Sequence, residues 1–156
     1  MRLNFLCPPQ RDALISDPAS ARQLWLVKLE LLESIPAEPS PYRVSLAGSA
    51  LEAATIYLHA RPPRTAELLE RYTRTALLLV DMLVSLGQSR LAIVVIAVAN
   101  ALLEHVALEG ADAGHAASAC RRLCQAGFTR LRSVPLPALR ASDGARRRAD
   151  GRLANA

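Results

Sequence analysis

The stretch SRLAIVVIAVANALLEHVALEG, residues 89–110, decides between an all-α fold and a mixed fold. Its first half is almost wholly apolar and rich in β-branched residues, so it would suit a buried strand as well as a helix. No second strand-like segment is visible elsewhere in the sequence to pair with it, and its several alanines favour a helix. A helix that is apolar on every side belongs in the centre of a bundle. We therefore expect residues 89–110 to form the central helix.

Helix start and stop signals divide the rest of the chain on both sides of this segment. Asp17-Pro18 and Ser40-Pro41 each join a capping side chain to a proline that suits the first helical position. Apolar residues then recur at helical spacing, and proline-rich connectors separate the segments. The helices that these signals predict cover about residues 18–34, 40–59, 65–87, 89–110 and 112–127.

The pattern predicts one all-α domain, an up-and-down bundle of four to five helices over residues 17–129. Short connections favour this topology because they place consecutive helices side by side in opposite directions. Residues 1–16 are expected to be an N-terminal extension. Residues 130–156 contain repeated proline and glycine breaks, and we expect them to be a disordered, Arg-rich tail.

The net charge of +5 belongs to this tail and not to the expected bundle. Residues 1–129 hold twelve basic and twelve acidic side chains, whereas residues 130–156 hold seven arginines and two acidic residues. Such arginines can bind phosphate backbones or anionic lipid, but no aromatic residue is interleaved for base stacking. The chain has a single lysine, and this bias is typical of a GC-rich, bacterial genome, so we favour a solvated terminus. The arginines of the possible electrostatic contact are Arg140, Arg146, Arg147, Arg148 and Arg152.

Targeting signals and membrane spans are not evident in the sequence. The N-terminal MRLNFLCPPQ has only a short apolar stretch before its prolines, where a secretory signal needs about 7–15 residues. The longest apolar run, residues 91–99, falls short of the about 20 residues that cross a bilayer. Three cysteines without an export signal are expected to stay reduced. These features predict a cytoplasmic protein without a transmembrane segment.

Motifs for catalysis, cofactor binding and metal binding are also missing. The sequence has no Gly-rich phosphate loop and no nucleophile or zinc-protease motif, and the side chains of Glu104 and His105 would point about 100° apart. Cys120 and Cys124 share one helical face, but a structural zinc site needs four ligands, so we favour two half-buried thiols. His115 lacks the lysine and glycine that usually follow a phosphotransfer histidine. We expect no enzyme, no cofactor and no metal.

The helix over residues 18–34 is the candidate partner-binding element, with Trp25, Leu29 and Leu32 as its candidate contact residues. Proline-rich connectors flank it, and several helices carry apolar faces broader than one core needs. A client helix or a second copy of the chain would cover the remainder. Asn100, on the most apolar helix, is expected to fix helix register through a buried hydrogen bond or to face a partner, and we favour the first.

Residues 40–126 resemble the flagellin-type export chaperones, which are small helical-bundle secretion chaperones. The resemblance rests on Ser40-Pro41 at a helix start, on the apolar run over residues 77–86, and on Leu91-Ala92 at the start of the next helix. Members of this family wrap an otherwise unpaired helical segment of their client. The resemblance implies a cytoplasmic chaperone and assigns no binding residue to this chain.

Taken together, the sequence predicts a non-enzymatic helical protein-binding module. The favoured hypothesis is a bacterial chaperone or adaptor of the secretion type that binds a helical segment of a partner protein or itself as a homodimer. The alternative is a nucleic-acid-associated transcriptional regulator that uses the Arg-rich tail.

Overall fold

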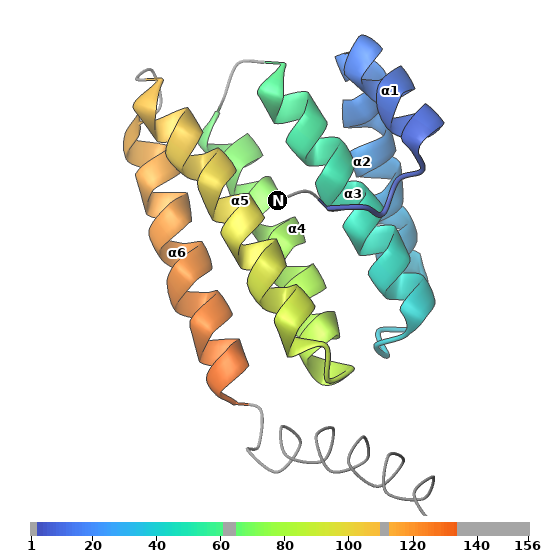
Figure 1. Ribbon diagram of the computed structural model, residues 1–156, viewed down its shortest axis with the longest axis vertical. Helices are drawn as coiled ribbons and strands as arrows, with labels where there is room; N and C mark the ends of the chain where they lie inside the picture. Colours follow the sequence, from blue (N-terminus) through green and yellow to red (C-terminus); the bar gives the residue numbers. More distant parts are fainter. Residues whose placement is uncertain (1–2, 61–64, 110–112, 134–156) are drawn as a thin grey trace, which may run out of the picture.

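The computed structural model describes residues 3–60, 65–109 and 113–133, and this part of the chain is all-helical. The predicted all-α class is confirmed, and the helix chosen over a strand for residues 89–110 is present. Figure 1 shows α2 to α6 running in alternating directions. The helices are α1 (Pro8–Ser16), α2 (Pro18–Ser34), α3 (Pro41–His59), α4 (Ala66–Ser85), α5 (Ser89–Leu108) and α6 (Ala113–Arg132).

The six helices of the described residues exceed the predicted four to five. The additional helix, α1, lies in the expected N-terminal extension and buries only Leu14, so it has no apolar periodicity for the sequence to reveal. The last helix also runs beyond residues 112–127 and crosses the expected tail boundary at residue 130. Gly127 does not stop it but allows close packing, because a Cβ there would lie 2.7 Å from Ile96 Cδ1 on α5.

Capping residues begin three helices where the sequence predicts them. The side chains of Asp17, Ser40 and Thr65 accept backbone N–H groups of the first turn at distances between 3.1 and 3.4 Å. These bonds satisfy donors that have no partner within the helix. At the other end of α4, Gly87 adopts φ +72°, a left-handed conformation that glycine reaches without strain.

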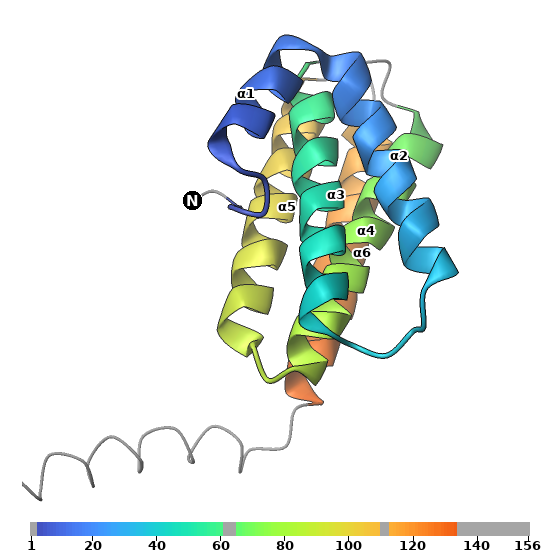
Figure 2. The same cartoon turned by 90° about the vertical axis from the view of Figure 1, so that its right-hand side faces the viewer.

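The central helix of the bundle is α4, which corrects the expectation that residues 89–110 occupy that place. Helix α4 packs against α3, α5 and α6, whereas α5 packs mainly against α4 and α6. Helix α2 lies along α3, and the short α1 covers the ends of both (Figures 1 and 2). High hydropathy therefore did not place α5 in the middle, and part of its apolar surface is exposed among the residues that the structure describes.

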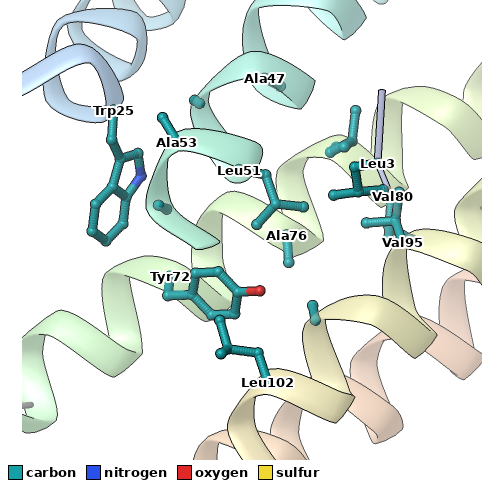
Figure 3. Close-up of a cluster of buried hydrophobic side chains, with 14 of the residues drawn as sticks. Leu3, Trp25, Ala47, Leu51, Ala53, Tyr72, Ala76, Val80, Val95 and Leu102 are labelled. Atoms are coloured by element: carbon teal, nitrogen blue, oxygen red, sulfur yellow. The ribbon is translucent and has the colours of Figure 1, made fainter. Parts of the chain in front are cut away.

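The core between α3, α4 and α5 is built mainly from leucine, valine and alanine (Figure 3). Leu51 and Tyr72 are fully buried at its centre. The Tyr72 hydroxyl lies 3.3 Å from Thr55 Oγ1, which gives this buried polar group a partner. Burial raises the pKa of Tyr72, so its phenol stays neutral. Leu3 reaches the same region from the N-terminal segment.

Candidate functional site

A groove of about 730 Å³ opens between α3 and α5, on a side of the bundle that no other long helix of the described residues covers. Helix α3 supplies one wall and α5 the other, while α1 and the N-terminal segment close one end. Polar side chains are few, and most of the lining is aliphatic. The lining residues are Leu3, Arg11, Ile15, Glu52, Thr55, Ile56, His59, Ala60, Ala97, Val98, Ala101, Leu102 and His105.

Helical spacing explains why each wall presents a continuous strip. On α3 the lining residues recur every three or four positions from Glu52 to Ala60, and on α5 they do so from Ala97 to His105. Each strip covers about two helical turns. Alanine occupies several lining positions and fills little space, which leaves the groove open between the two helices. The result is a concave apolar surface with walls of helical shape.

The outward face of α5 extends this apolar surface beyond the groove. Ile93, Ala97, Ala101 and Leu108 recur at spacings of four, four and seven residues, and all four are exposed. Ile93 is 51% exposed and Leu108 is 85% exposed. We call these four residues the α5 stripe. Ile93 and Leu108 are its two large members, and exposed apolar residues that share one helix face mark a surface suited to a partner.

A buried ion pair closes the end of the groove beneath α1. Glu52, only 5% exposed, accepts the backbone N–H groups of Phe5 and Leu6 at 2.8 and 3.0 Å. Arg11 Nε donates to the other carboxylate oxygen at 2.6 Å, and Arg11 Nη2 donates to the carbonyl oxygens of Leu3 and Leu6 at 3.3 and 3.2 Å. A buried carboxylate is tolerated only with such partners. Glu52 therefore anchors the N-terminal segment across α3.

Two histidines stand near the far ends of the two walls. The imidazole rings of His59 on α3 and His105 on α5 have centroids 6.2 Å apart. His105 Nε2 also lies 3.3 Å from Glu109 Oε1, one turn further along α5. The groove therefore has polar groups at both ends and an aliphatic middle.

Trp25, the central residue of the predicted partner contact, lies inside the bundle. It is 0% exposed, and its indole Nε1 donates to Thr75 Oγ1 on α4 at 3.1 Å. Leu32 is buried and Leu29 is partly buried against the same core. The structure thus corrects the assumption that this face of α2 is free, because α3 and α4 already cover it.

The arginines of the predicted electrostatic contact, residues 140, 146, 147, 148 and 152, lie outside the described residues. Arg130, the first residue of the expected tail, belongs to α6, where its Nε donates to Asp81 Oδ1 on α4. The described part of that segment is therefore joined to the bundle.

Asn100 is half-buried and hydrogen-bonds across the contact between α5 and α6, whereas the hydrogen bond predicted for it was a buried one. Its Oδ1 accepts from Cys120 Sγ at 2.7 Å and from Cys124 Sγ at 3.3 Å, and its Nδ2 donates to Glu104 Oε1 at 2.6 Å. Burial raises the pKa of the Cys120 thiol, and the neighbouring Cys124 and Glu104 raise it further. Both thiols are free and half-buried. Within the described ranges, no group of three or more His, Cys, Asp or Glu side chains is arranged to hold a metal.

Helix α5 is also the one described helix that is long and apolar enough to cross a membrane by length and composition. Its mean hydropathy reaches 2.2 over an 18-residue window, of which 39% is buried in the bundle. Core helices of bundles pass the same test, so these properties alone do not place α5 in a bilayer. Two large apolar side chains of this helix, Ile93 and Leu108, are nevertheless exposed.

Comparison of the chain with protein families, with curated proteins and with solved structures finds no match.

The groove has no signature in the local spacing of the sequence. Its clearest signal was Glu52, the single carboxylate in a stretch of small and apolar residues on α3. Its partner Arg11 is 41 residues away in sequence, so the pair could not be recognised from local spacing.

Proposed function

We propose that this chain is a non-enzymatic helical protein-binding module, a chaperone or adaptor of the secretion type. It takes one amphipathic helical segment of a partner protein into the groove between α3 and α5. The observation that carries this proposal is the groove itself, in which two largely apolar helix faces oppose each other with no third helix of the described residues between them. A partner helix would complete the packing, as in other helix-in-groove complexes.

The dimensions of the groove fit a docked helix of about two turns. At 1.5 Å of rise per residue, the strip from Glu52 to Ala60 and the strip from Ala97 to His105 are each about 12 Å long. Helices pack with their axes about 8–10 Å apart, and closer approach needs small side chains at the contact. Ala97 and Ala101 meet this need on the α5 wall. We expect the bound segment to place apolar residues at i, i+3, i+4 and i+7 toward the groove.

The α5 stripe supports the same proposal because it continues one wall of the groove. Of the most apolar window of α5, 39% is buried, and the four residues of the α5 stripe are exposed among the residues that the structure describes. A bound helix that lies along the groove would shield Ala97 and Ala101 and would reach Ile93 or Leu108 at its ends. Covering such a stripe supplies about 25 cal/mol for each Å² of apolar surface that leaves water.

A second copy of this chain is the competing occupant. The groove is concave and closed at one end by Leu3, Arg11 and Ile15, which suits an inserted segment better than the convex side of another bundle. We therefore favour a helical segment of a partner protein over a homodimer.

Site-specific photocrosslinking tests the proposal. A photoreactive residue placed at Ala101, in the groove, is compared with one at Gln125, which is exposed on α6 and outside the groove. The captured segment is mapped by mass spectrometry, synthesised, and its binding measured by fluorescence anisotropy. We expect an amphipathic helical segment that crosslinks only from Ala101.

Matched arginine substitutions then locate the binding surface. Ala101→Arg puts a long charged side chain into the groove and should weaken binding of the synthetic peptide about tenfold or more, because one desolvated charge costs more than 1.4 kcal/mol. Gln125→Arg should leave binding unchanged. Equal binding by both variants contradicts the proposal. Capture of only a second copy of the chain from Ala101, with a dimer seen by light scattering, replaces the partner helix with a homodimer.

A further inference from the structure

The contact between α5 and α6 contains a compact pair of thiols that the groove does not use. Cys120 and Cys124 lie four residues apart on α6, and both donate to the same oxygen, Asn100 Oδ1, at 2.7 and 3.3 Å. A shared acceptor brings the two sulfurs close together and points them toward α5. Both side chains are half-buried, so solutes can still reach them.

Helix geometry keeps these two sulfurs from bonding to each other. Residues four apart in an α-helix have Cβ atoms about 5–6 Å apart, whereas a disulfide needs about 3.5–4.5 Å between its Cβ atoms. A direct S–S bond would therefore unwind a turn of α6. A single atom between the sulfurs removes this conflict, because two metal–sulfur bonds of about 2.3 Å span about 4.6 Å.

The number of available ligands selects the kind of metal. Structural zinc takes four ligands, and no third His or Cys joins these two thiols in the part of the chain that the structure describes. Two thiolates alone suit a soft ion that accepts two-coordinate geometry, of which Cu(I) is the biological representative.

We propose that Cys120 and Cys124 form a two-coordinate binding site for a soft monovalent metal ion of the Cu(I) class. Each thiol loses its proton to solvent as its metal–sulfur bond forms, so two protons leave for each ion bound and no electron is transferred. The thiol hydrogen bonds to Asn100 are lost in the same step. The site therefore couples metal binding to the contact between α6 and α5.

Cu(I) itself is the probe, added anaerobically to the reduced full-length chain in competition with a chromogenic Cu(I) chelator. We expect one ion per chain in the unmodified protein. Cys120→Ala and Cys124→Ala should each remove this binding at the chelator concentration that still loads the unmodified chain. The matched control is Cys7→Ala, which removes the exposed third cysteine beside α1 and should bind one ion as before.

Two further measurements distinguish loss of the metal site from loss of the fold, and an intramolecular site from one shared by two chains. Circular dichroism and thermal unfolding show whether each alanine variant retains the fold, so lost binding in a folded variant supports the site. Light scattering shows whether the loaded chain stays at the mass of the free chain, as an intramolecular site requires. Equal binding by Cys120→Ala and the unmodified chain overturns the proposal, and so does loss of binding in Cys7→Ala or one ion shared by two chains.

Discussion

Trp25 on α2 and Leu108 on α5 are both large apolar side chains on helices, yet Trp25 is 0% exposed and Leu108 is 85% exposed. The indole of Trp25 is enclosed by α3 and α4, and its N–H has a partner in Thr75. Leu108 ends a stripe of exposed apolar residues that no helix in the described part of the chain covers. Trp25 therefore belongs to the packed core of the bundle, whereas the α5 stripe is an exposed apolar surface.

The largest effect on stability is expected from Trp25→Ala. The change leaves a cavity between α2, α3 and α4 and removes the hydrogen bond to Thr75, which should lower the free energy of unfolding by about 3–5 kcal/mol. Equilibrium denaturation in urea measures the loss. Such a loss is a large share of the about 5–15 kcal/mol that stabilises a typical domain.

Val27→Ala is the matched control, because Val27 lies on the same helix and is 50% exposed. It should cost about 1 kcal/mol or less, since part of the side chain already contacts water. If Trp25→Ala costs no more than Val27→Ala, Trp25 is not a core residue, and the partner contact predicted for it regains support.

A smaller effect is expected from Glu52→Gln, at the closed end of the groove. The amide offers one acceptor oxygen where the carboxylate offers two, so the backbone N–H groups of Phe5 and Leu6 or the guanidinium of Arg11 lose a partner. A buried polar group without its partner costs about 1–3 kcal/mol. Hydrogen exchange should also show that the amides of Phe5 and Leu6 lose protection.

Glu67→Gln is the matched control for Glu52→Gln, because it removes a carboxylate charge from an exposed ion pair. Glu67 pairs with Arg71 at 3.1 Å on the surface of α4, and its side chain is 80% exposed. Solvent screens such a pair, so its loss should change the free energy of unfolding by about 0.5 kcal/mol or less. Equal losses for the two variants would show that Glu52 does not anchor the N-terminal segment.

Local signals were enough to predict most of the helices. Asp17, Ser40 and Thr65 each satisfy free backbone N–H groups within one turn, so the sequence near each cap determines where the helix begins. α1 was missed because only Leu14 is buried along it. The end of α6 was misplaced because Gly127 resembles a helix stop, although its function is to let Ile96 of α5 approach closely.

Long-range packing determined what the sequence could not predict. The hydropathy of residues 89–110 shows that α5 avoids water, but it does not show which neighbours cover it. The sequence near Trp25 likewise does not show its neighbours, because its indole N–H donates to Thr75, 50 residues away in sequence. The groove arises where α3 and α5 both pack on α4 and leave a space between their facing sides, and no local pattern encodes that arrangement.

Leu108→Gln is expected to have the smallest effect on stability. It also tests directly whether a partner covers the α5 stripe. Because Leu108 is 85% exposed, the change should alter the free energy of unfolding by about 0.5 kcal/mol or less. Removing this apolar contact should nevertheless weaken a partner that covers the α5 stripe, by about tenfold if the side chain contributes 1.4 kcal/mol at the interface. Urea denaturation and peptide anisotropy on the same variant separate the two effects. A stability loss as large as that of Trp25→Ala would mean that Leu108 is covered within the chain, and the distinction between the two sides of the bundle would fail.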